Sequence, residues 1–114
     1  MYVDAKSFVV QVPEDRVNVY LPEVGKQVIF GLRPEDVYNP EFISPGIFPQ
    51  PVDVQVELVE LMGNEIFVYM KNGDHNFVAR VDPRSRYHMG EQTGMTFNMA
   101  NMHLFDAETE KALR

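Results

Sequence analysis

The sequence predicts an all-β fold, a small barrel of six or seven short strands with a long proline-rich loop. Three observations predict it. Apolar residues recur at every second position through most of the chain, which is the period of a strand that buries one face. These segments are short and are separated by clusters of Gly, Pro, Asn and Asp, the residues that form turns. The chain has 114 residues, 45% of them hydrophobic, which is enough for the core of one domain.

The first predicted strand covers residues 15–21 and places three apolar side chains on one face: Val17, Val19 and Leu21. Residues 22–26 form a turn, and the next strand covers residues 27–32. We expect this strand to stop at Arg33-Pro34, because proline cannot donate to a ladder and restricts the residue before it.

A long surface loop is predicted for residues 39–51, which contain these turn residues: Pro40, Pro45, Gly46, Pro49 and Pro51. The loop also carries apolar side chains, which predict that it packs on something: Phe42, Ile43, Ile47 and Phe48. Two interpretations stay open. The loop folds over its own barrel, or it meets another chain.

The next segment begins a three-strand meander. Residues 52–58 alternate strictly between apolar and polar, and the phase slips by one at Leu58-Val59. A one-residue slip inside a strand is what a β-bulge produces, and a bulge bends the strand. A turn at residues 62–65 follows, and such a corner helps a small sheet to curl and close into a barrel.

The second strand of the meander covers residues 66–71, and Asn72-Gly73 then predicts a tight hairpin. The return strand covers residues 75–81, and a further strand covers residues 95–99. Asp106 is placed to cap at most a turn or two of helix near the end of the chain. This series of short strands, nearly free of helix, favours a barrel of the OB kind.

The composition excludes several function classes. The chain has no cysteine, so it has no disulfide, thiolate metal site or Cys nucleophile. It has no apolar run long enough to span a bilayer and no visible signal peptide. The net charge of −7 disfavours nucleic acid as a partner. Phe67 and Tyr69 share one strand face, but Lys71 is the nearest cation, so a stacking platform for nucleic acid is poorly supported.

The search for chemistry finds no catalytic constellation. The Gly25-Lys26 pair lacks the other residues of a phosphate-binding loop. The spacing of the three histidines fits no compact metal motif. We expect His75 on the surface and His103 partly buried.

One cluster of cations points to an anion site. Arg80, Arg84 and Ser85 would bind a small oxyanion through guanidinium forks and a hydroxyl. The alternative is a solvated turn in which Asp82 pairs locally with Arg84. Both interpretations stay open at this point.

Four segments together resemble a known family: "FGLRPEDV" (30–37), "VELVELMGNE" (56–65), "FVARVDPRS" (77–85) and "HLFDAETEKAL" (103–113). They are similar to motifs, in the same order, in the C-terminal regulatory domain of the ATP-binding subunits of ABC sugar importers. These are the subunits of the maltose, glycerol-3-phosphate and multiple-sugar importers. The resemblance implies a transport-associated OB domain, a single unit over residues 1–114.

The resemblance further implies that the chain is the C-terminal part of a longer ATPase subunit, without its nucleotide-binding domain. ATP and Mg²⁺ would bind in that absent domain, so this chain would be non-catalytic and hold no cofactor. Its expected role is dimerisation and regulation, as a homodimer, with a regulatory protein as a further partner. The membrane permease would be contacted through the absent domain, at the cytoplasmic face of the membrane. The alternative is an oxyanion- or ligand-binding OB module.

The family motifs also imply site residues. Arg33, Pro34 and Glu35 match an Arg-Pro-Glu motif, and Gly63 and Glu65 match a Gly-x-Glu turn. We interpret all five as architectural or interdomain residues. The 39–51 loop differs from the family pattern, which leaves the identity of the partner open.

Overall fold

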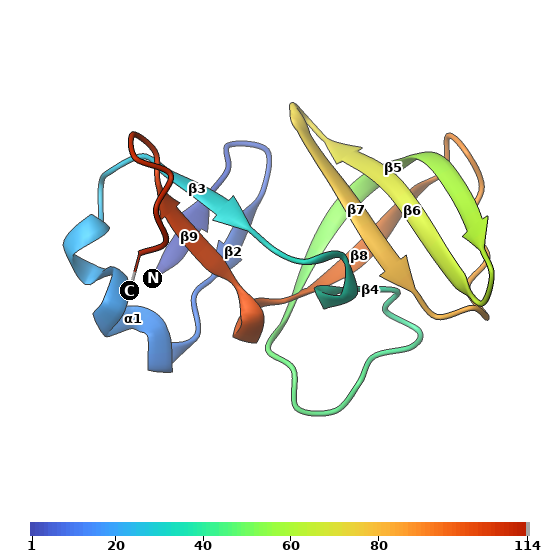
Figure 1. Ribbon diagram of the computed structural model, residues 1–114, viewed down its shortest axis with the longest axis horizontal. Coiled ribbons are helices and arrows are strands. Elements are labelled where there is room, and N and C mark those ends of the chain that lie inside the picture. Colours follow the sequence, from blue (N-terminus) through green and yellow to red (C-terminus); the bar gives the residue numbers. More distant parts are fainter. Residues whose placement is uncertain (114) are drawn as a thin grey trace.

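The computed structural model describes residues 1–113, which form two lobes that lie side by side (Figure 1). The large lobe is a five-stranded sheet in the order β4-β8-β5-β6-β7. Its elements are η2 (Pro34–Asp36), β4 (Val37–Tyr38), β5 (Pro49–Met62), β6 (Glu65–Asn72), β7 (His75–Val81) and β8 (Gln92–Asn98).

The sheet of the large lobe is curled into a half-barrel. All its ladders are antiparallel. Strands β4 and β7 are the two edges of the sheet, and the curl brings β4 and the adjacent η2 against β7. No ladder between described residues joins β4 to β7. The inward faces form the core, with buried side chains from every strand: Val37, Val52, Val54, Val56, Ile66, Val68, Met70, Ala79, Val81, Met95 and Phe97. The all-β, OB-like fold is thus confirmed.

Two hairpins build the meander, and each turns on a glycine. Gly63 and Gly73 have φ of 65° and 57°, a conformation that glycine adopts without steric cost. Gly73 and Asp74 are the two loop residues of the second hairpin, because Asn72 already pairs with His75. The predicted hairpin is confirmed, with its turn one residue later than Asn72-Gly73.

The long strand β5 explains where its prolines and its bulge lie. The ladder with β6 shifts register between Val56 and Leu58, so Glu57 is the extra residue of a bulge. The predicted bulge is confirmed, one residue earlier than Leu58-Val59. Pro49 and Pro51 lie before the stretch that β6 covers. The Val56 amide donates to the Glu91 carbonyl, so the backbone N–H and C=O groups of the even-numbered residues point toward β8. The backbone nitrogens of the two prolines therefore point away from β8. Proline is tolerated there because no partner strand needs its N–H.

The predicted 39–51 loop is therefore wrong at its end, since β5 already begins at Pro49. The loop covers residues 39–48 and is fixed to the large lobe at both ends. The Phe48 amide donates to the Asn98 side chain (3.1 Å), and Asn39 donates to Ser85. The loop therefore packs on its own domain at these two points.

The small lobe holds the remaining elements. They are β1 (Tyr2–Asp4), β2 (Val9–Gln11), α1 (Glu14–Tyr20), η1 (Leu21–Glu23), β3 (Val28–Gly31), η3 (Met99–Asn101) and β9 (His103–Asp106). Its strands form two separate two-stranded sheets, β1-β2 and β3-β9. Over residues 1–113 the structure thus has nine strands, more than the six or seven predicted.

The strand predicted at residues 15–21 is wrong, because this segment is the helix α1. Pro13 precedes it, and the acidic Glu14 and Asp15 lie in its first turn, where the helix dipole favours negative charge. Val17 and Tyr20, three residues apart, pack on the core, as a helix requires.

The end of the chain forms no more than a turn after Asp106, which agrees with the prediction of at most a turn or two. The Asp106 carboxylate accepts hydrogen bonds from the Glu108 and Thr109 amides, but the result is a turn and not a helix. The His103 side chain is exposed, because its neighbour Leu104 takes the inward position on β9. The expectation of a partly buried His103 is therefore wrong. In the described part of the chain, no helix is both long and apolar enough to cross a bilayer.

An aromatic cluster joins the two lobes. Phe97 of β8 is fully buried, and three rings surround it: Phe8 (centroids 5.9 Å apart), Phe30 (6.2 Å) and Phe77 (5.2 Å). Phe8 and Phe30 come from the small lobe, and Phe77 and Phe97 come from the large lobe. The two lobes therefore share one core.

Candidate interaction surface

The outer face of the β5–β6–β7 sheet carries apolar side chains where polar ones are usual. Residues that pair across a ladder point to the same face, so the register defines the rows of this face. Leu58 pairs with Tyr69, and Tyr69 pairs with Val78. In the next row, Phe67 lies between Glu60 and Arg80. We call the apolar members of this face the outer patch: Leu58, Met62, Phe67, Tyr69 and Val78.

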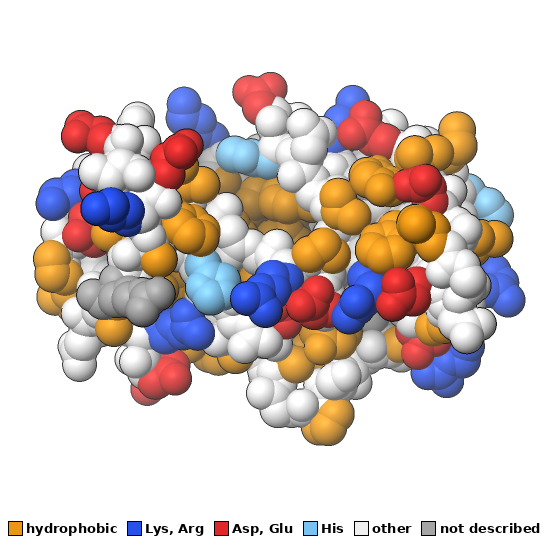
Figure 2. All heavy atoms as spheres, in the orientation of Figure 1, with side chains coloured by type: hydrophobic (Ala, Val, Ile, Leu, Met, Phe, Trp, Pro, Cys, Tyr) orange, Lys and Arg blue, Asp and Glu red, His pale blue; other side chains and the backbone are white. Residues whose placement is uncertain are grey.

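The outer patch is open to solvent. The side chains of Leu58 and Met62 are 43% and 57% exposed, and the other three members are half-buried. Figure 2 shows hydrophobic side chains gathered over this part of the large lobe, with acidic and basic side chains among them. A contiguous apolar patch with a polar rim is typical of a surface that contacts another protein.

Two charged residues of this face form an ion pair. The Arg80 guanidinium lies 3.6 Å from the Glu65 carboxylate, at the side of the patch. Both groups are about half exposed, so this ion pair contributes little to the stability of the fold. The Glu60 carboxylate beside the Tyr69 hydroxyl raises the pKa of Tyr69.

The predicted motif residues fall at two places. Gly63 and Glu65 lie at the β5–β6 turn, so Glu65 borders the outer patch. Pro34 is the first residue of the short helix η2, and Arg33 precedes it with extended backbone. Arg33 and Glu35 are exposed, and no ion pair joins them in the described residues. An interdomain role for these five residues stays a prediction.

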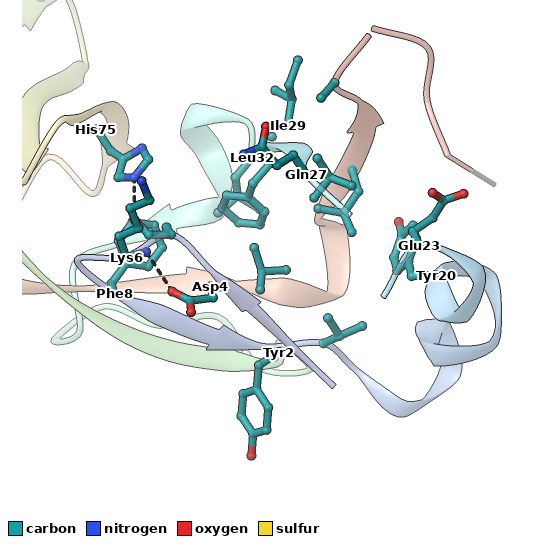
Figure 3. Close-up of a pocket in the computed structure, with 18 of the residues that line it drawn as sticks. Tyr2, Asp4, Lys6, Phe8, Tyr20, Glu23, Gln27, Ile29, Leu32 and His75 are labelled. Carbon is teal, nitrogen blue, oxygen red and sulfur yellow. Dashed lines mark hydrogen bonds between the residues drawn. The ribbon is translucent and has the colours of Figure 1, made fainter. Parts of the chain in front are cut away.

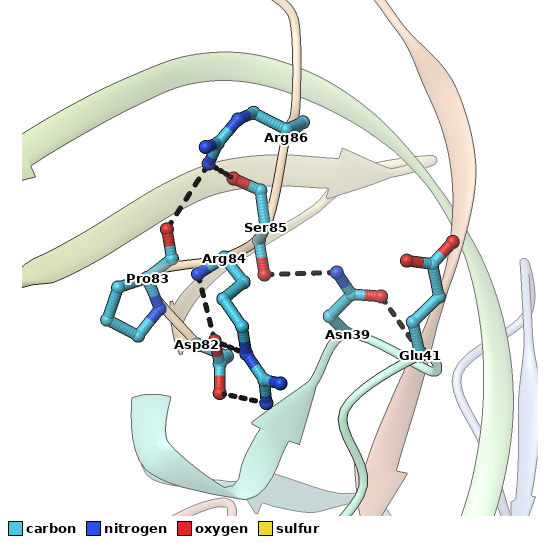
Figure 4. Close-up of polar contacts among 7 residues, drawn as sticks. All are labelled: Asn39, Glu41, Asp82, Pro83, Arg84, Ser85 and Arg86. Atoms are coloured by element: carbon cyan, nitrogen blue, oxygen red, sulfur yellow. Dashed lines mark hydrogen bonds and ion pairs between the residues drawn. The ribbon is translucent and has the colours of Figure 1, made fainter.

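Two of the predicted anion-binding residues, Arg84 and Ser85, are held in separate pairings (Figure 4). Asp82 binds Arg84 with two side-chain contacts of 2.9 and 3.0 Å, and the Arg84 guanidinium also lies 4.2 Å from the centre of the Phe42 ring. This pairing lowers the pKa of Asp82. The Ser85 hydroxyl is buried and accepts a hydrogen bond from the Asn39 amide (3.0 Å).

Arg80 pairs with Glu65 instead and does not join this group. The local Asp82–Arg84 pair is thus present, and these contacts tie the 39–48 loop to the segment after β7. Anion binding by Arg80, Arg84 and Ser85 stays a prediction.

Sequence reasoning placed Phe67 and Tyr69 on one face but missed Leu58, Met62 and Val78 as their neighbours. The signal was present in "IFVYM", residues 66–70, where both faces of the strand are apolar. A strand that is apolar on both faces is typically covered on both faces. The bulge hid the rest, because it moves Leu58 from the inner face to the outer face.

Comparisons with known proteins agree on one family. No protein-family model matches the chain. The multiple sugar-binding transport ATP-binding protein MsmK of Streptococcus mutans is 44% identical over 89 residues, covering 78% of this chain and 24% of that protein. The oligosaccharides import ATP-binding protein MsmX of Bacillus subtilis is 33% identical, covering 90% of this chain and 29% of that protein. The trehalose/maltose import ATP-binding protein MalK of Thermococcus litoralis is 36% identical, covering 98% of this chain and 31% of that protein.

The relatives that cover this chain are ATP-binding subunits of ABC sugar importers. The chain matches their C-terminal part and spans between about a quarter and a third of the length of these relatives. The resemblance drawn from the four sequence motifs is therefore confirmed.

Proposed function

We propose that the chain is a non-catalytic dimerisation and regulatory domain. It would belong to the ATP-binding subunit of an ABC importer, and that importer would take up sugars. The observation that carries this proposal is the outer patch, an exposed apolar face on a rigid sheet. A second copy of the chain would pack its own outer patch against it across a two-fold axis. Such an interface is self-complementary, so one patch serves both partners.

The charge pattern of the face supports a second copy as the partner. Glu60 and Glu65 lie on the same face as Arg80, and Lys71 lies one row beyond Tyr69. A face that carries both signs of charge can pair with itself, whereas a face of one sign repels its copy. The patch is small, so the isolated chain should dimerise weakly.

The remainder of the proposal concerns the longer subunit. Residues 1–114 would form its C-terminal part, and ATP hydrolysis with Mg²⁺ would take place outside these residues. The subunit would work on the cytoplasmic side of the membrane with permease subunits, and a regulatory protein would be a further partner. The names of the relatives support sugars as the substrate class.

The test is self-association of the isolated chain, measured by sedimentation equilibrium up to millimolar concentration. We expect a weak dimer, and Leu58→Glu should weaken it at least about tenfold, which is about 1.4 kcal/mol. Met89→Glu is the matched control, because Met89 is also exposed (69%) but lies outside the sheet. A strict monomer at every concentration, or equal weakening by both substitutions, contradicts the proposal.

A further inference from the structure

A long groove runs between two strands of the small lobe that do not pair with each other, and the β6–β7 hairpin of the large lobe also lines it. It has a volume of about 1730 Å³, larger than the range of typical small-molecule pockets. Figure 3 shows it between the N-terminal strand segment, which carries Tyr2, Asp4 and Phe8, and the segment that carries Gln27, Ile29 and Leu32. One wall is thus β1 with the turn that follows it, and the other wall is β3.

The groove follows the backbone edges of these strands and not one of their faces. Every residue from Met1 to Phe8 lines it, and so does every residue from Val24 to Leu32. Side chains alternate between two faces along a strand, so only an edge is shared by consecutive residues. Residues 9–11 of β2 do not line the groove, which places it on the side of β1 away from β2.

The hydrogen-bond pattern shows which groups of β1 point into the groove. The Val12 amide donates to the Met1 carbonyl and the Ala5 amide donates to the Phe8 carbonyl, both 2.9 Å. The backbone N–H and C=O groups of the odd-numbered residues of β1 therefore point toward β2, because hydrogen-bonded and non-bonded pairs alternate in an antiparallel ladder. The N–H and C=O groups of Tyr2 and Asp4 point the other way, and within residues 1–113 they have no backbone partner.

The same reasoning applies to β3. On β9, Leu104 and Asp106 bond to the segment that follows it, through the Leu113 amide and the Lys111 carbonyl. The backbone groups of the odd-numbered β9 residues, His103 and Phe105, therefore point toward β3. These two residues pair with Gly31 and Ile29. The backbone groups of Val28 and Phe30 point away from β9, toward the groove, and bond to no other backbone in the described chain.

The side chains around the groove suit an extended segment with apolar residues. Val12, Tyr20 and Leu104 are buried and line it, together with the half-buried rings of Phe8 and Phe30. Two sheet edges that face one groove with an apolar lining are the features that accept an added β-strand. A strand in this place would join the two small sheets into one sheet in the order β2-β1-added strand-β3-β9.

We propose that this groove holds a β-strand contributed by the subunit's own polypeptide outside residues 1–114. The relatives that this chain matches are three to four times its length, so such a polypeptide has ample extra chain to supply a strand. A strand from the same polypeptide is also favoured by its high effective concentration. The inference rests on the proposal that these residues form part of a longer subunit, but it does not depend on dimerisation.

The test compares amide hydrogen exchange in residues 1–114 with exchange in the full subunit expressed from the gene that encodes them. Both proteins carry Leu58→Glu, so that dimerisation through the outer patch does not enter the comparison. In the short chain, the amides of Tyr2, Asp4, Val28 and Phe30 should exchange fast. In the full subunit they should slow at least about a hundredfold, because a backbone partner protects them.

The neighbouring amides of Val3, Ile29 and Gly31 are the internal control, since they bond within the existing ladders. They should be protected in both proteins and should change much less. Equal rates for the four edge amides in both proteins overturn the proposal. So does an equal slowing of edge and control amides, which reports general stabilisation only. Protection that appears in the short chain as its concentration rises assigns the groove to a second copy, and this also overturns the proposal.

Discussion

The two lobes differ in the length of their strands and in how these strands pair. In the large lobe, each strand joins one five-stranded sheet, and the β5–β8 ladder alone runs over seven residue pairs. In the small lobe, strands of three or four residues form two separate pairs and leave a groove between them. A strand of this length has few contacts of its own, so the small lobe depends on its neighbours for stability. The comparison shows that the long strands of the large lobe pair into one sheet, whereas the short strands of the small lobe remain in separate pairs.

The largest effect on stability is expected at the aromatic cluster that joins the two lobes. A substitution there tests whether the lobes unfold as one unit. Phe97→Ala removes a fully buried ring that contacts Phe8, Phe30 and Phe77. We expect the free energy of unfolding to fall by about 3–5 kcal/mol, and the signals of both lobes to be lost together. Urea unfolding followed residue by residue with NMR measures this.

The matched control for the junction is Phe67→Ala on the outer patch, where the ring is only half-buried. It should cost clearly less than the change at Phe97. If the small lobe kept its own transition after Phe97→Ala, the lobes would be independent.

A smaller effect on stability is expected in the small lobe, where Arg16 attaches α1 to the chain before β9. The Arg16 guanidinium of α1 donates to the carbonyls of Ala100 (2.8 Å) and Met102, which holds the helix on the segment before β9. Arg16→Met keeps the aliphatic stem and leaves these two carbonyls without their donor. We expect a loss of about 1–3 kcal/mol in thermal unfolding, with the first protection loss in α1.

The control for this change is Lys71→Met, which removes an exposed charge that makes no ion pair among residues 1–113. It should change stability by less than about 0.5 kcal/mol. Equal losses for the two variants would show that the helix is not held by Arg16.

At alkaline pH, an effect on stability is expected in the large lobe. Burial, together with the charges of Glu91 and Glu41, raises the pKa of Tyr87 to about 12. A raised pKa favours the neutral form in the fold, so its contribution is full below the ordinary value of 10.0 and is lost as pH rises toward 12. The free energy of unfolding should fall between pH 9 and pH 11, and solvent screening of the half-buried ring keeps this fall below about 1.4 kcal/mol. In Tyr87→Phe this fall should become clearly smaller, and a fall of the same size would contradict the assignment to Tyr87.

The smallest effect concerns the predicted anion residues. Arg84 is already paired with Asp82 and Arg80 with Glu65, so an added oxyanion would compete with a carboxylate at each arginine. We expect no saturable heat when sulfate, phosphate or molybdate is titrated into the chain by calorimetry. Saturable binding that is lost in Arg84→Gln would instead establish the oxyanion module.

Much of the large lobe could be predicted from the sequence because its signals are local. The alternation, the phase slip near Leu58 and the turn glycines each act within a few residues. The small lobe could not be predicted in this way. Residues 15–21 alternate like a strand, and only the preceding proline and the acidic first turn favour the helix that forms. Strands β1 and β2 are three residues each, too short for a periodic pattern to identify.

The outer patch was only half predictable for a related reason. Phe67 and Tyr69 are two residues apart on one strand, so the alternation places them on one face. Leu58 and Val78 lie beside them because both pair with Tyr69 in the neighbouring ladders. The register of these ladders cannot be read directly from the sequence. The position of the bulge decides that register, and a shift of one residue would place Leu58 in the core.

The central claim is that this domain works by contacting another copy of itself through the outer patch. The most direct measurement is a series of amide NMR spectra of the isolated chain, recorded as its concentration rises to the millimolar range. The account predicts progressive shifts that cluster on β5, β6 and β7 around Leu58, Phe67, Tyr69 and Val78, and that vanish in Leu58→Glu. Spectra that do not change with concentration, or shifts that cluster elsewhere on the molecule, would contradict it.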